Sequence, residues 1–524
     1  MVEMPEHVVF QKKDGNKYAY YTTKSFRNSK GRPDNKRVCI GKCDDKTGKL
    51  IPNGKYYELF GLTAPMNLPN VVRRCGSYAV CRNLAEQLGL LQILKEVFPV
   101  YYEEILTGAH YMLTSGSVMY YLNDWLDGTV SFTPDVLDDV AIGRMFKTIN
   151  DEKRNEFFRA WMSKKGRKEF IAYDVTSISS YSRSLENVEY GYNRDKEKLP
   201  QINYGMYLGE ESRIPFYYRV YPGSINDKTH CESMIEGTDW LDFKNAYFVM
   251  DKGFFTEENL KFITEKGHRF MITMPPSLKA YKKLIDENKA DIINNVEYKV
   301  RDRLVYCKKV EKNLYGFRMN VHIFYNQDKA ADNSRTLYEK LEEMENDISK
   351  MTVVPSANSS YFDYFSFTQK DGYVVAEKKN DEIKKALDRC GFFAICETAF
   401  NKTSEEILDI YSDRDSIEKC FDDLKNEIDF DRIRCSTEET AEGKMFVAFI
   451  SLILLSQLRK ALKDYARKNK YTIKKMILEL DKIKIAYDSS KPEQYRLLNP
   501  VTKKQREILE QLNMSKDIFK SLFN

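Results

Sequence analysis

The stretch YSDRDSIEKCFDDLK, residues 411–425, is the part of the sequence around which the fold is organised. On an α-helix at about 100° per residue, Tyr411, Arg414, Glu418 and Lys425 share one arc of roughly 60°. An apolar stripe lies directly beside this arc and consists of Ile410, Ile417, Phe421 and Leu424. The helix can therefore bury one flank in a core and hold a carboxylate, two cations and a phenol along the edge of that core.

Taken alone, the same stretch has a simpler interpretation. Amphipathic surface helices with ion pairs are common, and Arg414 and Glu418 have the i,i+4 spacing of such a pair. Two aspartates far upstream, Asp174 and Asp251, are what favour a functional site over a solvated helix.

Length and composition set broad limits. A chain of 524 residues with 42% hydrophobic residues predicts several domains with real cores. The net charge of +5 says little about partners. Residues 1–60 are more informative, because 13 Lys and Arg stand against 7 Asp and Glu in a stretch rich in Tyr. Such a region is compatible with nucleic-acid binding, although a solvated surface is the commoner explanation.

Cysteine usage and hydropathy point to a reducing compartment. The ten cysteines show no CxxC pairs and the five histidines are scattered, so neither zinc sites nor a disulfide framework is expected. No signal peptide opens the chain, and the longest apolar run, 445–455, is too short to span a bilayer at about 20 residues. We expect a soluble cytoplasmic protein with no membrane partner.

The N-terminal third changes from strand-like to helical patterns. Residues 8–60 alternate apolar and polar positions with turn signals at 14–15, 31–33 and 47–48, which predicts short antiparallel strands. A Pro-containing linker, TAPMNLPN at 63–70, closes this unit, and residues 76–165 have a helical pattern.

The middle of the chain predicts an α/β sheet of mixed direction. The segment EFIAYDVTSISS at 169–180 reads as a short strand ending in Asp174, and a hairpin follows at 201–208 and 213–223. A helix is expected near 229–238, and the strand NAYFVM at 245–250 delivers Asp251 at its end. A helix at 257–266 and a strand at 269–275 complete this part.

Residues 276–390 interrupt the sheet with two charged helices (277–289 and about 335–350) and strand-like runs at 297–310, 315–325 and 361–376. A strand at 391–398 returns to the core. Thr403 and Glu406 offer a capping box to the helix that carries residues 411–425. A buried helix at 443–459 and a charged helical tail finish the chain.

Three carboxylates suggest a metal site. A charge at the end of a buried strand is costly unless something offsets it. Asp174 and Asp251 could each simply cap a turn or pair with a cation. Together with Glu418 they would repel one another unless divalent cations lay between them, and hard oxygen ligands suit Mg²⁺ or Mn²⁺. Two such ions about 4 Å apart stabilise the attacking and leaving oxygens of a phosphoryl displacement.

These motifs resemble those of a known family. Asp174 in YDVTSISSYS, Asp251 in MDKGF and the spacing Tyr411-x2-Arg414-x3-Glu418-x6-Lys425 resemble the DDE triad and Y-R-E-K signature of bacterial insertion-sequence transposases. Further blocks that resemble the family lie at 35–52, 189–205 and 218–229, so the resemblance covers most of the chain.

The resemblance implies an architecture and an activity. It implies a ribonuclease-H-like core split by a β-rich insertion, and an enzyme that binds the terminal inverted repeats of its element, cleaves the DNA at the ends and joins 3′-hydroxyls to target DNA. In Y-R-E-K relatives excision can pass through a hairpin. The expected domains are 1–66 (β-rich, basic, DNA-binding), 67–165 (helical, DNA-end-binding), 166–275 and 391–460 (catalytic core), 276–390 (insertion) and 461–524 (C-terminal helical region, which can support a synaptic homodimer).

The same resemblance implies roles for particular residues. Asp174, Asp251 and Glu418 would be catalytic metal ligands for two Mg²⁺ ions, with Mn²⁺ as a substitute. Tyr411, Arg414 and Lys425 would hold phosphates next to the scissile bond, Arg through its planar fork and Lys as a point charge. Relatives commonly have Arg after the second aspartate, whereas this chain has Lys252, which would give a looser phosphate contact.

Two further groups are weaker candidates. Thr176 and Ser177 could touch a phosphate, but hydroxyls near a strand more often satisfy the backbone. The loop residues Tyr190, Tyr192, Asn193 and Arg194 could stack on DNA or line a pocket for a flipped base, and a surface loop without such contacts is equally compatible with the sequence.

Two other functions remain open at the level of sequence. One is a DNA-binding relative that no longer cuts, against which the intact acidic triad argues. The other is a nuclease with the same core that hydrolyses DNA without joining it, and the full spacing of residues 411–425 favours joining.

Overall fold

The computed structural model describes the chain apart from residues 14–15, 28–30, 46, 63–70, 135, 166–168, 242–243, 294, 301–304, 371–372, 399–400, 489–490, 516–517 and 520–524. The predicted linker at 63–70 and the predicted turn at 14–15 lie outside the described residues. The chain forms two compact units, one of Met1–Phe157 with Asp422–Asn524 and the other of Phe158–Phe421.

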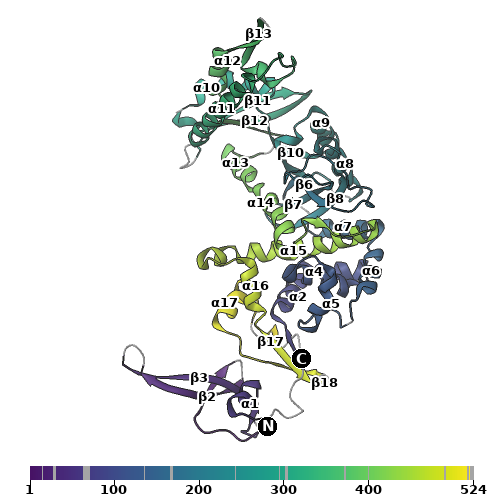
Figure 1. Ribbon diagram of the computed structural model, residues 1–524, viewed down its shortest axis with the longest axis vertical. Coiled ribbons are helices and arrows are strands. Elements are labelled where there is room, and N and C mark those ends of the chain that lie inside the picture. Colours follow the sequence, from purple (N-terminus) through teal and green to yellow (C-terminus); the bar gives the residue numbers. More distant parts are fainter. Residues whose placement is uncertain are drawn as a thin grey trace. The chain divides into compact units, whose positions relative to one another are not determined.

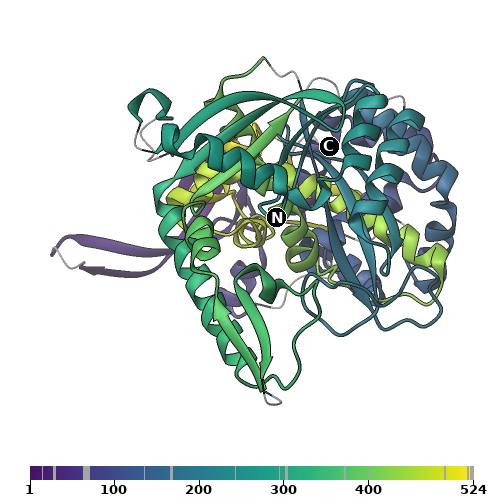
Figure 2. The same cartoon turned by 90° about the horizontal axis from the view of Figure 1, so that it is seen from above.

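The second unit, Phe158–Phe421, is built on a mixed β-sheet. Its strands lie in the order β11-β12-β15-β10-β9-β6-β7-β8, with parallel pairing for β10–β9 and β9–β6 and antiparallel pairing elsewhere. Helices flank the sheet (Figure 1 and Figure 2), which confirms the predicted α/β class. The strands are β6 (Phe170–Ser180), β7 (Gln201–Gly209), β8 (Pro215–Pro222), β9 (Tyr247–Met250), β10 (Arg269–Thr273), β11 (Val305–Leu314), β12 (Phe317–Asn326) and β15 (Phe392–Glu397).

The strands at the centre of the sheet are buried because both faces of the sheet are covered. β6, β7 and β9 are buried along nearly their whole length. The helices beside them are α8 (Asp227–Trp240) and α9 (Glu257–Glu265), whose bounds are similar to those predicted from the sequence. The short 3-10 turn η2 (Lys252–Phe254) follows β9.

The segment 276–390 contributes to the sheet instead of standing apart from it. Its β11–β12 hairpin pairs with β15 and so extends the sheet. The remainder packs as a small core around Leu341, Phe365 and Ile383. The expected β-rich composition is wrong for the described part, since three α-helices accompany the strands: α10 (Lys279–Ile292), α11 (Gln327–Ile348), α12 (Asn380–Leu387), η3 (Val296–Tyr298), η4 (Ser360–Asp363), β13 (Phe365–Lys370) and β14 (Tyr373–Lys378).

The first unit begins with an antiparallel sheet, as the alternating pattern of residues 8–60 predicted. Its strands are β1 (Val8–Lys13), β2 (Asn16–Arg27), β3 (Pro33–Cys43) and β4 (Leu50–Pro52), followed by α1 (Gly54–Phe60). Ala19, Ile40 and Leu50 form its small core with two tyrosines of α1. The long β2–β3 hairpin extends from this sheet (Figure 1).

The rest of the first unit is mainly helical and packs around α15 (Glu438–Asn469), which contains the predicted buried helix 443–459. Gly443 allows the helix Asp139–Thr148 to approach closely, because a Cβ at residue 443 would lie 2.6 Å from Phe146. The other elements are β5 (Val71–Arg74), α2 (Gly76–Leu88), α3 (Leu90–Val97), α4 (Tyr102–Ser115), η1 (Met119–Tyr121), α5 (Leu122–Asp127), α6 (Asp139–Thr148), α7 (Asp151–Lys165, which continues into the second unit), η5 (Asp423–Glu427), β16 (Arg432–Ile433), α16 (Ile473–Leu480), β17 (Lys484–Asp488), β18 (Lys491–Leu497) and α17 (Lys503–Gln511).

Within the described residues, α15 is the one helix that is long and apolar enough to cross a membrane by length and composition. Its most apolar window is 78% buried inside the protein, as expected of a core helix.

Candidate active site

Two neighbouring parallel strands bring Asp174 and Asp251 together. Tyr173 of β6 pairs with Met250 of β9, so the next residue on each strand is an aspartate at the same level of the sheet. The prediction that Asp174 ends its strand is wrong, because β6 continues to Ser180 along β7, where Asp174 pairs with Met206. Asp251 does follow the last residue of β9, as predicted.

A pair of consecutive helices supplies the other side chains. The predicted capping box of Thr403 and Glu406 is present at the start of α13 (Ser404–Asp413), which carries Tyr411. Ile407 and Leu408 pack this helix on the sheet. Arg414 lies at the junction with α14 (Asp415–Asp422), which carries Glu418.

The prediction of one regular α-helix through residue 425 is wrong. The helix is interrupted at Arg414 and becomes a π-helical turn, η5, over Asp423–Glu427. A π-helix has i→i+5 hydrogen bonds and turns by a smaller angle per residue than an α-helix. Lys425 therefore does not lie on the same helix face as Tyr411, Arg414 and Glu418, as α-helical spacing had predicted. Buried Asp423 pairs with Arg459, which holds this turn against α15 inside the first unit.

The guanidinium of Arg414 contacts all three predicted acids. Its Nη2 lies 3.0 Å from Glu418 Oε1 and 4.0 Å from Asp251 Oδ1, and its Nη1 lies 3.7 Å from Asp174 Oδ2. The Arg414 side chain is only 11% exposed. The structure therefore gathers side chains that are up to 244 residues apart in the chain around one buried cation.

This cation is held incompletely. Two of its three carboxylate contacts are longer than a normal hydrogen bond, and the buried Arg414 Nε has no hydrogen-bond partner. Burial opposes its charge, but Tyr411, Asp251, Asp174 and Glu418 together raise the pKa of Arg414 above its usual value, so it remains charged.

Asp174 is the most strongly perturbed of the three acids. Burial raises the pKa of Asp174 to about 6, although Arg194 and Arg414 act in the opposite direction. Its side chain is 15% exposed, against 38% for Asp251 and 57% for Glu418. The negative charge of Asp174 is therefore only partly compensated by the two arginines.

Tyr411 completes the cluster. Its hydroxyl contacts the Thr273 hydroxyl at the end of β10 and donates to Asp251 Oδ1 at 3.5 Å, and its ring lies 5.6 Å from the Arg414 guanidinium carbon. Burial raises the pKa of Tyr411 to about 12, which keeps the phenol neutral and able to donate a hydrogen bond.

The two predicted lysines lie differently. Lys252 is exposed in η2, directly after Asp251. Lys425 is half-buried in η5, which belongs to the first unit. Five predicted side chains therefore form one cluster in the second unit: those of Asp174, Asp251, Tyr411, Arg414 and Glu418. Lys425 belongs to the first unit and is not part of this cluster.

The loop after β6 reaches Asp174. Arg194 Nη1 lies 3.9 Å from Asp174 Oδ1. Buried Asn193 holds the loop by donating to Ser179 Oγ and accepting from the backbone of Asp195. Tyr190 and Tyr192 are 72% and 83% exposed, so their rings are available for stacking.

The hydroxyls of Thr176 and Ser177 lie inside β6, where both residues are buried. Ser177 donates to the Tyr192 carbonyl at 3.5 Å. The Ser177 hydroxyl therefore bonds to a backbone carbonyl, which is the interpretation that we favoured from the sequence.

Two residues near the site were not anticipated. Thr273 carries no sequence signal beyond its place at a strand end. Glu210 is buried in the β7–β8 turn, where burial, Asp413 and Glu169 raise its pKa to about 8. A turn of sequence GEES predicts an exposed carboxylate, and only the tertiary packing reveals that Glu210 is enclosed.

The three acids are chemically suited to a divalent cation. Three carboxylates that converge on one positive charge are the hard ligands that Mg²⁺ prefers, and the raised pKa of Asp174 indicates unmet negative charge. As placed, no group of three or more His, Cys, Asp or Glu side chains in the described part of the chain is close enough to hold an ion. The residues fit a divalent cation if the Arg414 guanidinium leaves the acids.

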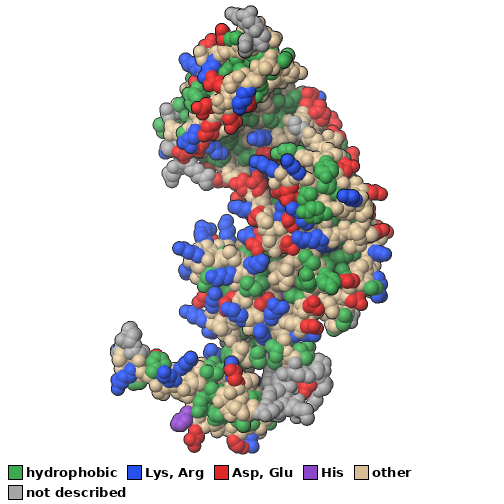
Figure 3. Space-filling view, viewed as in Figure 1, with side chains coloured by type: hydrophobic (Ala, Val, Ile, Leu, Met, Phe, Trp, Pro, Cys, Tyr) green, Lys and Arg blue, Asp and Glu red, His purple; other side chains and the backbone are tan. Residues whose placement is uncertain are grey.

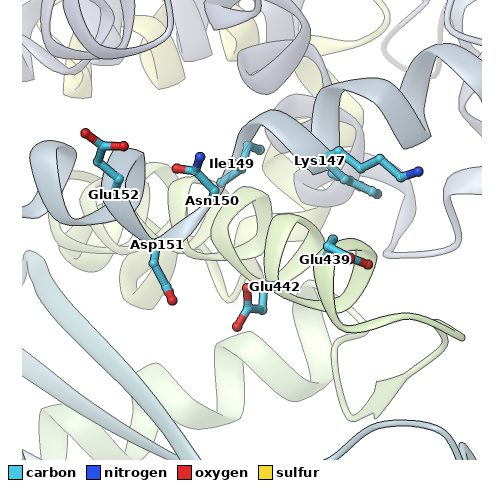
Figure 4. A pocket seen from close by; sticks show the side chains of 8 residues that line it. Lys147, Ile149, Asn150, Asp151, Glu152, Glu439 and Glu442 are labelled. Carbon is cyan, nitrogen blue, oxygen red and sulfur yellow. The ribbon is translucent and has the colours of Figure 1, made fainter.

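A second acidic cluster lies in the first unit. A pocket of about 350 Å³ between α6, α7 and α15 has Asp151, Glu152, Glu439 and Glu442 on its walls (Figure 4). Arg154 contacts Asp151 and lies 3.0 Å from Glu442, so two of these acids already share a cation.

The fold and the cluster define a class of protein: an α/β domain that presents acids from two adjacent parallel strands and from a helix. A family model described as "Transposase DDE domain" matches residues 165–454, more than half of the chain. The chain belongs to this family of DDE transposases, whose members generally use divalent metal ions.

No curated protein matches the chain. Among solved structures, it is similar to a piggyBac transposase in a cryo-EM synaptic complex with hairpin DNA, at 8% identity and a TM-score of 0.34. The match covers 74% of this chain and 63% of that one, so the chain spans less than two thirds of the length of that relative.

Proposed function

We propose that this protein is the transposase of a bacterial insertion sequence of the Y-R-E-K class. It binds the terminal inverted repeats of its element, cleaves the DNA at the ends and joins the 3′-hydroxyls to target DNA. Its core is of the ribonuclease-H-like type, split by the segment 276–390. It acts in the cytoplasm as a homodimer that pairs two element ends.

One observation supports this proposal above the others: a single buried guanidinium contacts Asp174, Asp251 and Glu418. Glu418 has the i,i+4 spacing of an ordinary helical pair, but Asp174 and Asp251, if they merely capped turns, would have no reason to share a cation from a helix more than 150 residues further along the chain. The shared contact favours a common site over three separate structural roles.

The three acids would hold Mg²⁺, with Mn²⁺ as a substitute. Two bound ions would stabilise the negative charge that develops on the phosphate during the reaction. In the first step, the oxygen of water bonds to phosphorus, the bond from phosphorus to the 3′-oxygen breaks, and that oxygen takes the proton. In the second step, the oxygen of the new 3′-hydroxyl bonds to a target phosphorus, the target's bond from that phosphorus to its own 3′-oxygen breaks, and that oxygen takes the proton of the attacking hydroxyl.

The cations and the phenol of the signature would position DNA. Arg414, once it has left the acids, has the planar fork that fits a phosphate in two places. Tyr411, neutral because of its raised pKa, can donate a hydrogen bond to a phosphate oxygen. Lys425 and Lys252 would supply point charges, and Lys252 is already exposed beside Asp251.

The test uses labelled DNA fragments taken from the two flanks of the coding region, incubated with Mg²⁺. Asp174→Ala, Asp251→Ala and Glu418→Ala should each lower end cleavage by at least a thousandfold while leaving binding of the fragments intact. Asp415→Ala is the matched control, because Asp415 is an exposed acid on the same helix as Glu418 and is not among the three acids that contact Arg414 in the described part of the chain.

Two outcomes would contradict the proposal. Cleavage retained by an Asp174→Ala or Glu418→Ala variant would remove that residue from the site. Wild-type protein that binds the fragments without cutting them would indicate a DNA-binding relative, and cleavage without joined products would indicate a nuclease.

A further inference from the structure

The C-terminal helices of the first unit gather a marked excess of positive charge. Residues 459–475, RKALKDYARKNKYTIKK, contain eight Lys and Arg and a single acid, Asp464. Figure 3 shows Lys and Arg side chains crowded over the end of α15 and over α16 and α17. This excess is local, because the whole chain has a net charge of only +5.

The charges on α15 form a stripe. At about 100° per residue, Lys460, Lys463 and Arg467 lie within roughly 60° of one another on the helix surface. All three are exposed, and Lys468 is exposed beside them. The stripe is about 10 Å long at 1.5 Å per residue, and over that length a DNA duplex carries roughly six phosphates.

The neighbouring helices extend the same surface. α16 presents exposed Lys474 and Lys475, and α17 presents exposed Lys503 and Arg506. Tyr471, between α15 and α16, has Lys475 Nζ 4.7 Å and Lys504 Nζ 4.3 Å from its ring centroid. The aromatic ring thus brings two lysines from different helices to one place.

Few acids offset these charges. Asp464 pairs with Arg467, but both side chains are more than 70% exposed, and such pairs contribute little. Glu479 and Glu507 contact lysines at the edge of the surface. Within the described residues, no carboxylate lies within 4.0 Å of the basic side chains of Lys463, Lys468, Lys470, Lys474 and Lys475.

We propose that this surface, called here the C-terminal basic surface (Lys460, Lys463, Arg467, Lys468, Lys470, Lys474, Lys475, Lys503, Lys504 and Arg506), binds the phosphate backbone of double-stranded DNA without reading its sequence. The inference rests on the proposed function, because it names a second contact with the same partner. The inference assigns DNA binding to the C-terminal helical region, for which the sequence resemblance implied only support of a synaptic homodimer.

An anionic membrane is the alternative partner for such a surface. Membrane-surface helices need an exposed apolar face opposite the charges. Here the apolar residues of the same helices, Leu462, Ile473, Met476 and Ile477, are buried inside the unit. One large apolar side chain of α16, that of Leu478, is exposed. The surface can attract polyanions but has little to insert into lipid, which favours DNA.

The experiment measures binding of the full chain to a fluorescent 30-bp duplex of arbitrary sequence by anisotropy, without divalent cations, at 50 to 300 mM salt. The variant is Lys463→Gln/Arg467→Gln/Lys468→Gln. Because each phosphate contact contributes about 0.9 to the slope of log K against log salt, the slope should fall by up to about 2.7. Affinity at 100 mM salt should fall at least tenfold.

The matched control is Lys283→Gln/Arg335→Gln/Lys350→Gln, which removes the same charges from exposed positions of α10 and α11 and the turn after α11 in the second unit. It should leave the slope nearly unchanged. Equal effects of the two triple variants would show that only net charge matters and would overturn the inference. If the C-terminal triple variant lost binding to phosphatidylserine vesicles but bound the duplex normally, the inference would be overturned and the surface would be a lipid-binding one.

Failure of this inference is distinguishable from failure of the proposed function. If the C-terminal variant binds the duplex normally and still cleaves flank fragments with Mg²⁺, the surface assignment is wrong and the transposase proposal stands. If the wild type neither binds the duplex nor cleaves the fragments, the proposed function itself fails.

Discussion

Two buried arginines, one in each unit, are each surrounded by acids, and the contrast between them is instructive. Arg154 donates to the Ile149 carbonyl at 2.8 Å, lies 3.0 Å from Glu442 and contacts Asp151. Arg414 has one contact of 3.0 Å, two of 3.7 and 4.0 Å, and a buried Nε without a partner. The two side chains are almost equally buried, at 9% and 11% exposed.

We interpret the Arg154 cluster as structural and the Arg414 cluster as the proposed metal site, from which the arginine would have to move. Arg154 caps the end of α6 by its bond to the Ile149 carbonyl and ties α6 to α15 through Glu442, and its other acid, Asp151, is 82% exposed. Arg414 faces a buried aspartate with a raised pKa and holds two of its three acids at distances longer than a hydrogen bond. Loose contacts around buried charge are costly to keep, and such groups are enriched at functional sites.

The largest expected change in the free energy of unfolding concerns Asp174, the buried acid beside Arg414. The folded-state pKa of Asp174, about 6, lies above the ordinary value of 3.8. The native state is therefore stabilised when Asp174 is protonated, and this contribution is lost as pH rises from about 4 to about 6. Asp174→Asn should avoid that loss and be more stable than the wild type by about 3 kcal/mol at pH 8.

Chemical unfolding of both proteins in chelator at pH 3.5 and pH 8 checks this expectation. At the lower pH the two proteins should differ little, because the wild-type carboxyl is then neutral. A stability difference that is the same at both pH values would show that Asp174 does not have a raised pKa. Asp151→Asn provides the comparison from the other cluster and should show no gain at pH 8, because the Asp151 side chain is 82% exposed.

The second expectation compares the two arginines directly. Arg154→Met and Arg414→Met should each lower the free energy of unfolding by about 2 kcal/mol without metal, because each removes charge-assisted hydrogen bonds. Addition of 10 mM Mg²⁺ should restore the stability of Arg414→Met, since a divalent cation can replace the missing positive charge among three acids. It should not restore Arg154→Met.

Thermal denaturation with and without Mg²⁺ distinguishes the two variants. Equal rescue of both would mean that the ion acts on the protein in general. No rescue of Arg414→Met would mean that the acids cannot hold a cation even when the guanidinium is gone.

Much of the fold follows from the sequence because its strands and helices have strong local signals. The buried run NAYFVM and the hairpin around Gly209 were predictable from apolar runs and turn residues. The end of β6 was not, because Thr176–Ser180 is polar and is retained in the sheet by its pairing with β7. The β11–β12 hairpin likewise joins the sheet through β15, a partner about 70 residues away that no local pattern reveals.

The cluster at the site was predictable in composition but not in geometry. Helical spacing placed Tyr411, Arg414 and Glu418 on one face, and the structure has them side by side. The same rule failed at Lys425, because the chain switches to a π-helical turn held by the Asp423–Arg459 pair. The sharing of Arg414 by all three acids depends on the β6–β9 register, which the sequence does not specify.

We propose as the central claim that Asp174, Asp251 and Glu418 form one divalent-cation site and that the Arg414 guanidinium occupies this site in the metal-free protein. Calorimetric titration of Mn²⁺ into the DNA-free protein tests it most directly. The claim predicts that Arg414→Gln binds Mn²⁺ at least tenfold more tightly than the wild type, and that adding Asp174→Asn to that variant abolishes the binding. Equal Mn²⁺ affinity of the wild type and Arg414→Gln, or binding that survives Asp174→Asn, would contradict it.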